Sequence, residues 1–416
     1  MTLHLSTLSN GLRVITDPIE GVETAALGIW VGVGARHESA ETNGLAHFLE
    51  HMAFRGTVHR TGREIAESIE NVGGYLNAYT SKEATAYYAR VLAKDVPLAL
   101  EIIADILQYS VFAEEELNRE RTVILQEIGQ TQDTPDDVVF EDFQLTAFPN
   151  QALGRSILGP VENVRSFQSQ DFKHYMKCHY GADQMVLVAT GKVDHDSIHQ
   201  QAESLFNALQ PMVTLNPERG VYQGGNHRRS RDLEQVHLVL GYEGVAKGSP
   251  PFYAASLLAT LLGGGMSSRL FQEVREKRGL VYSIQAFTQS YRDCGVFGVY
   301  AGTSEENIAE LMPVVRDECR AIMHNCSDDE LRRAQNQLKA SLMMARESTS
   351  ARCEQLAQQM LTYGRPLDPG EIMDRIDAVS CADIGAVAQH IFSSKPTLSA
   401  IGPSRALEVL SKSSEL

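Results

Sequence analysis

The two halves of the chain repeat one another, and this internal repeat restricts the fold more than any other feature of the sequence. Residues 75–80, YLNAYT, have an echo in residues 283–288, SIQAFT. Residues 115–119, EELNR, have an echo in residues 329–333, DELRR. The order of predicted elements after each echo is also similar, which indicates a tandem duplication.

A short segment near the middle of the chain separates the two copies. Residues 212–231 are rich in Pro, Gly, Asn and Arg and have little periodicity, which predicts a linker. We therefore expect an N-terminal domain over residues 1–211 and a homologous C-terminal domain over residues 232–416. Two domains of this size suit a chain of 416 residues.

Each copy mixes strands and helices in an order that does not alternate strictly. In the first copy, the hydrophobic periodicity predicts helices over residues 44–54, 95–109 and 114–129, and strands over residues 75–80 and 85–91. This order predicts an α+β fold of two homologous domains, each a largely antiparallel sheet flanked by helices.

The composition excludes some partners but names no function. The chain has 53 acidic and 37 basic residues, a net charge of -16, and such a surface repels nucleic-acid phosphates and anionic lipids. We therefore expect no nucleic acid and no membrane as a main partner. The N-terminus has no signal or transit pattern, no apolar run approaches ~18 residues, and the six cysteines are scattered. These features predict a cytoplasmic protein with reduced thiols, most simply a bacterial one.

The most informative motif is H-x-x-E-H over residues 47–51. On a helix, His47 and His51 lie on one face and can bind one metal ion. Glu50 borders the same face and can reach a metal-bound water without being a ligand. Two imidazoles, one carboxylate and an open fourth position make a catalytic zinc site. The alternative is a polar helix face with two solvated histidines.

A third ligand is needed from another element, and the predicted helix over residues 114–129 offers several glutamates. Glu127 follows an apolar run, and Glu120 lies two turns earlier on the same face. This arrangement suits one ligand and one supporting carboxylate. The spacing alone does not decide which glutamate is the ligand.

With these motifs in place, the sequence resembles the pitrilysin family of zinc metallopeptidases. Within it, the likeness is to the processing-peptidase branch, typified by the beta subunit of mitochondrial processing peptidase and bacterial relatives. The resemblance covers nearly the whole chain and rests on residues 47–57 (HFLEHMAFRGT), 74–80 (GYLNAYT) with Glu83 and Thr85, 120–128 (ERTVILQEI), 263–270 (GGGMSSRL) and 279–282 (GLVY).

The resemblance implies one Zn²⁺ per chain, held by His47, His51 and Glu127. It implies that Glu50 is the catalytic base and that Glu120 supports the site without being a primary ligand. It also implies that the strand carrying Asn77, Ala78 and Thr80 binds an extended peptide as an added strand. The alternative for Asn77 is an ordinary strand residue.

Further residues are implied to bind substrate. Arg275 and Tyr282 match a pair that holds the substrate carbonyl and stabilises the oxyanion. The alternative is a solvated basic helix with a core tyrosine. Asp137 and Glu141 match acidic positions that bind a basic residue upstream of the cut, and at i and i+4 they can share one guanidinium. The alternative for these two is a solvated acidic helix start.

The second copy is predicted to lack the metal site. An approximate registration puts Ser256, Ala259 and Thr260 against the H-x-x-E-H residues, and Ser341 against Glu127. The second domain would then be a scaffold and a substrate wall.

We therefore expect a zinc endopeptidase that cuts extended or presequence-like peptides, with a preference for a basic residue upstream. A homodimer with Arg275 and Tyr282 acting in the partner's site is expected, and a heterodimer is the alternative. The rival function is a non-catalytic assembly or core subunit.

Overall fold

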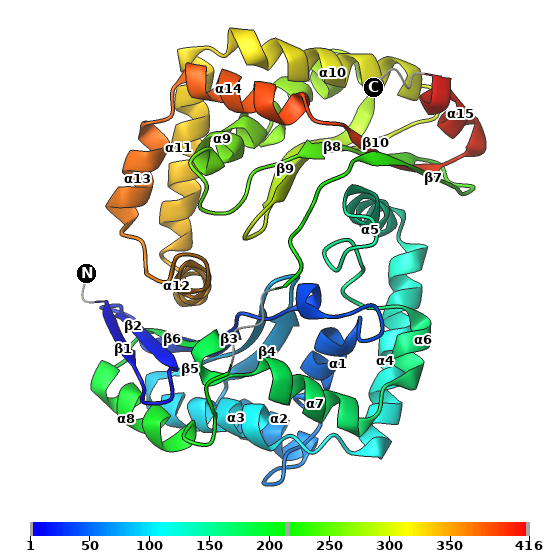
Figure 1. Cartoon of the computed structure of the whole chain (residues 1–416). Coiled ribbons are helices and arrows are strands. Elements are labelled where there is room, and N and C mark those ends of the chain that lie inside the picture. Colours follow the sequence, from blue (N-terminus) through cyan, green and yellow to red (C-terminus); the bar gives the residue numbers. More distant parts are fainter. Residues whose placement is uncertain (1–2, 213–216, 413–416) are drawn as a thin grey trace. The chain divides into compact units, whose positions relative to one another are not determined.

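The structure is a computed structural model that describes residues 3–212 and 217–412 (Figure 1). The chain forms two compact units, and neither is continuous in sequence. The first unit comprises Met1–Gly129, Arg155–Glu218 and Met344–Pro366; the second comprises Gln130–Gly154, Arg219–Met343 and Leu367–Leu416. The predicted ranges 1–211 and 232–416 are continuous, whereas each unit contains a segment from the other half.

The first unit is built on a six-stranded sheet in the order β1-β2-β6-β3-β5-β4. Every neighbouring pair is antiparallel except β2 and β6. Strands β1 and β2 form a hairpin around Asn10-Gly11, where Gly11 has a φ of 93°. The strands are β1 (His4–Thr7), β2 (Arg13–Pro18), β3 (Thr24–Val31), β4 (Tyr75–Thr80), β5 (Thr85–Leu92) and β6 (Met185–Gly191).

The second unit repeats this arrangement without the first strand. Its sheet has the order β7-β11-β8-β10-β9, with β7 and β11 parallel and the other pairs antiparallel. The echoed segments 75–80 and 283–288 fall in the edge strands β4 and β9, so the duplication and the α+β class are confirmed. The strands are β7 (Gly225–Ser230), β8 (Val236–Glu243), β9 (Val281–Ser290), β10 (Gly295–Thr303) and β11 (Thr397–Gly402).

The predicted linker over residues 212–231 is too long. Residues 213–216 lie outside the described residues, but residues 225–230 form β7 and pair with β11. The strand reads GNHRRS and shows no apolar alternation, because it lies at the edge of the sheet and is mostly half-buried. Hydrophobic periodicity therefore gave no signal for this strand.

Helices cover both faces of the first sheet. Helices α3 and α1 contact β3, β5 and β4, whereas α12 contacts β3 and β6. Thr61 and Glu64 form a capping box at the start of α2. The helices of this unit are η1 (Ala35–His37), α1 (Leu45–Met52), α2 (Gly62–Glu70), η2 (Ala93–Asp95), α3 (Val96–Tyr109), most of α4 (Glu114–Asp133), α6 (Val161–Ser166), α7 (Ser169–His179), η3 (Ala182–Gln184), α8 (His195–Leu205) and α12 (Thr349–Tyr363).

The second echo of the sequence also falls in matching helices. Residues 115–119 lie at the start of α4, and residues 329–333 lie at the start of α11 in the second unit. Its helices are α5 (Pro135–Ala147), α9 (Phe252–Gly263), η4 (Phe271–Glu276), α10 (Ile308–Asn325), α11 (Asp328–Ala345), α13 (Pro369–Asp377), α14 (Cys381–Phe392) and α15 (Ser404–Lys412). In the part of the chain that the structure describes, every helix is too short or too polar to cross a lipid bilayer.

Candidate metal centre

Helix α1 carries the H-x-x-E-H motif, and its apolar residues anchor it to the core of the first unit. The buried residues are spaced so that they share one side of the helix, namely Leu45, Ala46, Phe48, Leu49 and Met52. The remaining side therefore presents His47, Glu50 and His51.

The start of α1 is fixed by a carboxylate from another segment. Gly44 precedes the helix with a φ of 99° and has no side chain with which to cap it. The buried Glu38 replaces that cap, since its carboxylate accepts the N–H groups of Gly44 at 3.0 Å and Ala46 at 2.6 Å. A negative charge is stabilised at a helix N-terminus, so this contact fixes the position of the helix.

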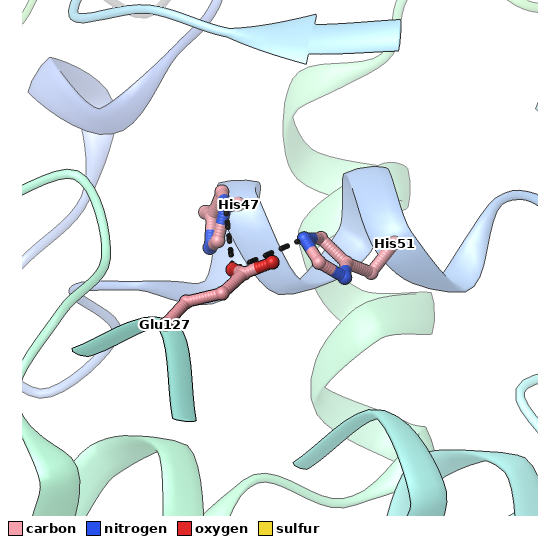
Figure 2. A group of neighbouring side chains, drawn as sticks. All are labelled: His47, His51 and Glu127. Carbon is pink, nitrogen blue, oxygen red and sulfur yellow. Dashed lines mark ion pairs between the residues drawn. The ribbon is translucent and has the colours of Figure 1, made fainter. Parts of the chain in front are cut away.

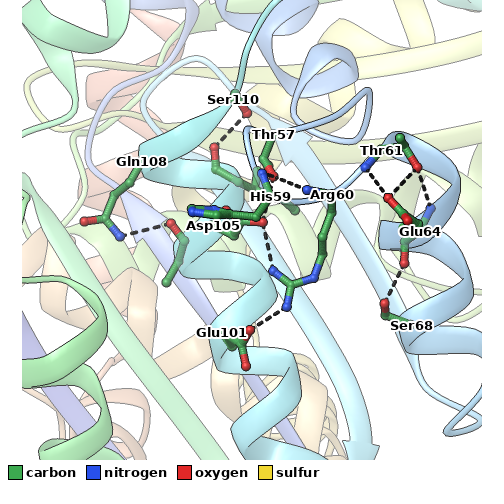
Figure 3. A network of polar contacts seen from close by, with 12 residues as sticks. Thr57, His59, Arg60, Thr61, Glu64, Ser68, Glu101, Asp105, Gln108 and Ser110 are labelled. Carbon is green, nitrogen blue, oxygen red and sulfur yellow. Dashed lines mark hydrogen bonds and ion pairs between the residues drawn. The ribbon is translucent and has the colours of Figure 1, made fainter.

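His47, His51 and Glu127 come together at one point between α1 and α4 (Figure 2). The Oε2 atom of Glu127 lies 3.7 Å from Nε2 of His47 and 3.5 Å from Nε2 of His51. One ligand atom from each of the three residues lies within 4.8 Å of the others. Among the described residues, this is the one group of three or more His, Cys, Asp or Glu side chains that could hold a metal ion.

The donor set fits zinc. Two imidazole nitrogens and one carboxylate oxygen are its usual catalytic ligands, and tetrahedral zinc with bonds of ~2.0–2.1 Å separates its ligand atoms by ~3.4 Å. The separations of 3.5 and 3.7 Å are close to that value. Small side-chain movements would therefore complete the coordination.

Glu120 takes a different place from Glu127. Its carboxylate is almost fully buried and lies 3.0 Å from Nδ1 of His51, on the far side of the ring from Glu127. Arg55 contacts its other oxygen at 2.5 Å. A carboxylate on Nδ1 fixes the ring and leaves Nε2 as the ligand atom. The geometry therefore supports Glu127 as the third ligand and Glu120 as its supporting neighbour.

The two histidines differ in electrostatics. Burial, helped by the nearby His51, lowers the pKa of His47 to about 4, so this imidazole is neutral at pH 7. Burial also acts to lower the pKa of His51, but the hydrogen bond with Glu120 and the charges of Glu127 and Glu50 outweigh it and raise that pKa. A cation at His51 would therefore compete with a proton for this ring.

Glu50 is half-buried on the same side of α1. Burial raises the pKa of its carboxyl group, and the charge of Glu127 adds to this effect. A hydrogen bond from Thr80 and the charge of His51 act in the opposite direction. A carboxylate with a raised pKa is a stronger base, which suits the role expected of Glu50.

Two family models match the chain. The model described as Insulinase (Peptidase family M16) matches residues 13–161, and the model described as Peptidase M16 inactive domain matches residues 166–338. The chain belongs to peptidase family M16. The metal cluster lies wholly within the range of the first model, and the predicted pitrilysin-family likeness and metalloendopeptidase class are confirmed by this membership.

Curated M16 relatives match over nearly the whole chain. A protein named uncharacterized zinc protease from Rickettsia felis is 41% identical, with 96% of this chain and 97% of the relative covered. A probable mitochondrial-processing peptidase subunit beta from Arabidopsis thaliana is 40% identical, with 96% and 78% covered. The crystal structure of a protease from Helicobacter pylori, 21% identical, has the same fold with a TM-score of 0.88 over 97% of this chain and 99% of that one.

The residues implied to bind substrate in this M16 member fall in both units. In the first unit, Asn77, Ala78 and Thr80 lie in β4, which is the edge strand expected for an added peptide strand. Thr80 also hydrogen-bonds Glu50, so this strand runs past the base. The Oδ1 atom of Asn77 accepts the amide of Ala78 at 2.9 Å.

The other four implied substrate residues lie in the second unit. Asp137 and Glu141 occupy successive turns of α5, as their spacing predicted. The guanidinium of Arg275 lies over the ring of Phe271, 4.8 Å from its centroid. Tyr282 is 66% exposed, so the alternative of a core tyrosine is wrong. The approach of these residues to the metal cluster stays a prediction.

Sequence reasoning missed Glu38 and the role of Arg55. Arg55 lies inside the quoted motif, four residues after His51, and this i,i+4 spacing could have suggested a contact near the site. Glu38 gave no signal, because a cap supplied by a separate segment follows no fixed spacing.

Proposed function

We propose that the chain is a zinc-dependent endopeptidase that hydrolyses extended or presequence-like peptides. The observation that carries this proposal is the convergence of His47, His51 and Glu127 beside Glu50. Three ligands leave one position open for water or substrate, which distinguishes a catalytic zinc site from a structural one.

In this proposal each residue has one task. When bound, zinc polarises the scissile carbonyl and lowers the pKa of water towards ~7. Glu50 takes the proton from the attacking water and then delivers it to the leaving amine. Glu120 holds the His51 ring through Nδ1. The free edge of β4, including Asn77 and Ala78, aligns the peptide through backbone hydrogen bonds and therefore tolerates many sequences.

Removal and return of zinc tests this function. The purified protein should contain about one zinc per chain and should cleave unstructured peptides. Dialysis against a chelator should abolish cleavage, and one equivalent of Zn²⁺ should restore it. A protein that contains no zinc, or that is equally active without it, would contradict the proposal and favour the non-catalytic assembly subunit.

A preference for a basic residue upstream of the cut is proposed for Asp137 and Glu141. Two carboxylates one helical turn apart can bind one guanidinium in two places. We expect Asp137→Asn with Glu141→Gln to lower kcat/KM about 10-fold or more for peptides with arginine upstream, and to leave alanine peptides nearly unchanged. Asp136→Asn, which changes the exposed neighbour, is the matched control. An unchanged cleavage map would show that neither residue binds the upstream basic side chain.

A homodimer in which Arg275 and Tyr282 serve the partner's zinc site is also proposed. Mixing two inactive variants tests it, because Glu50→Gln and Arg275→Ala chains would form mixed dimers with one intact site. Random mixing should restore about a quarter of wild-type activity. A monomer in light scattering, or no restoration in a confirmed dimer, would contradict this arrangement. Full activity only with a second, degenerate chain would instead favour the heterodimer.

The bacterial cytoplasm is the proposed location. It agrees with the composition and with free cysteines at all six described positions, as expected in a reducing compartment. Cell fractionation that placed the protein outside the cytoplasm would contradict it.

A further inference from the structure

Helix α12 comes from the second half of the sequence but belongs to the first unit (Figure 1). It packs on the sheet face opposite to the one that α1 and α3 cover, since alternate residues of β3 belong to two different hydrophobic clusters. The cluster beneath α12 joins Trp30 and other sheet residues to the helix residues Cys353, Leu356, Ala357 and Met360. The helix is therefore a structural part of the catalytic unit.

Glu354 places a carboxylate at the margin of this apolar contact. Its Oε1 atom accepts the hydroxyl of Tyr79 at 2.6 Å and the amide of Gln358 at 3.0 Å. Its Oε2 atom accepts the indole N–H of Trp30 at 3.0 Å. Three donors converge on one carboxylate, which is the environment that an ionised acid requires when it is partly buried.

Tyr79 connects this carboxylate to β4. Burial and the charge of Glu354 raise the pKa of the Tyr79 phenol, so its O–H remains a donor at neutral pH. Along β4, Tyr75, Asn77 and Tyr79 share the face towards α12, and Ala78 packs into the cluster on the α1 side. Among the described strands, β4 pairs only with β5. The other side of β4 is therefore the edge of the sheet.

An edge strand has ladder hydrogen bonds on one side alone, and its shape depends on what its side chains contact. The Glu354–Tyr79 hydrogen bond is such a contact, and it lies one residue from both Ala78 and Thr80. We propose that Glu354 is a positioning residue that holds β4 in the conformation that accepts a peptide strand. The peptide-binding part rests on the function proposed above.

Hydrogen exchange and kinetics of Glu354→Ala test this inference. We expect the amides of β4 that hydrogen-bond β5 to exchange at least about 10-fold faster, while those of β6 stay protected. With peptide substrate, KM should rise about 10-fold and kcat should stay within about twofold, because Glu50 and the metal ligands are untouched. Zinc content should not change. Glu354→Gln, whose amide oxygen can still accept the tyrosine hydroxyl, should recover most of the loss.

Glu347→Ala is the matched control, since it removes the same charge from an exposed turn just before α12. If Glu354→Ala does not fold, Tyr79→Phe removes the same hydrogen bond and should reproduce the faster exchange of β4. Unchanged exchange in β4, an equal effect of Glu347→Ala, or a loss confined to kcat would overturn the inference. If the wild type cleaves no peptide, the proposed function fails, and the exchange measurement still decides whether Glu354 holds the strand.

Discussion

Glu50→Gln is expected to reduce kcat for peptide hydrolysis by ~10²–10⁴-fold, the range that general acid–base catalysis contributes. The amide has nearly the size of the carboxylate but cannot take a proton from water or return one to the leaving amine. Because Glu50 is not a member of the three-ligand cluster, bound zinc should remain near the wild-type level. The measurement is kcat with a fluorogenic peptide, together with metal analysis of the same sample.

The control for this substitution is Glu67→Gln, at an exposed position of α2 in the same unit. It removes an equal charge and breaks one surface ion pair, which contributes little. Its kcat should match the wild type. Wild-type activity in Glu50→Gln would exclude Glu50 as the base, and loss of zinc from Glu50→Gln would show that it acts on the metal site instead.

Glu127→Gln and Glu120→Gln should weaken zinc binding by very different amounts. Loss of a carboxylate that supports a histidine ligand typically costs ~10–100-fold in metal affinity or activity, and we expect this for Glu120→Gln. Glu127→Gln removes one of three ligands and should cost considerably more. Zinc affinity measured by competition with a chelator of known strength separates the two variants.

Peptidase activity at saturating zinc is a second measurement that distinguishes Glu120→Gln from Glu127→Gln. Glu120→Gln should recover much of its activity there, because its ligands are intact, whereas Glu127→Gln should not. Glu115→Gln, at an exposed position at the start of the same helix, is the control and should bind zinc normally. A greater loss of affinity in Glu120→Gln than in Glu127→Gln would reverse their assignment.

The sequence was sufficient where local pattern determines structure. Strand β4 occupies residues 75–80, as predicted, because strand-favouring tyrosine and threonine residues lie between two stopping signals, the glycines at 73 and 74 and the turn before residue 85. The metal motif was also local, since two histidines four residues apart share a helix face whatever surrounds them. The internal echoes located both edge strands and so indicated the duplication.

The sequence was insufficient where distant segments meet. Glu120 and Glu127 share a face of α4, and only the packing of α1 against that helix shows that one faces Nδ1 of His51 and the other Nε2. Glu354 contacts a strand 275 residues away in the sequence, so no spacing rule identifies it. Glu38 is near α1 in the sequence, but it caps that helix across an irregular loop, and such a loop follows no fixed spacing either. The polar sequence of β7 predicts a linker, and the strand with which it pairs, β11, lies over 160 residues later in the chain.

Because each unit is built from separate segments of the chain, no single cut in the gene separates the two units. The chain passes from one unit to the other five times, after residues 129, 154, 218, 343 and 366. A fragment that stops in the predicted linker would encode the metal ligands but not α12, and the apolar face around Trp30 would meet water. The catalytic half is therefore not a portable module, and an insertion, deletion or exchange of halves between relatives would have to carry both segments to give a folded enzyme.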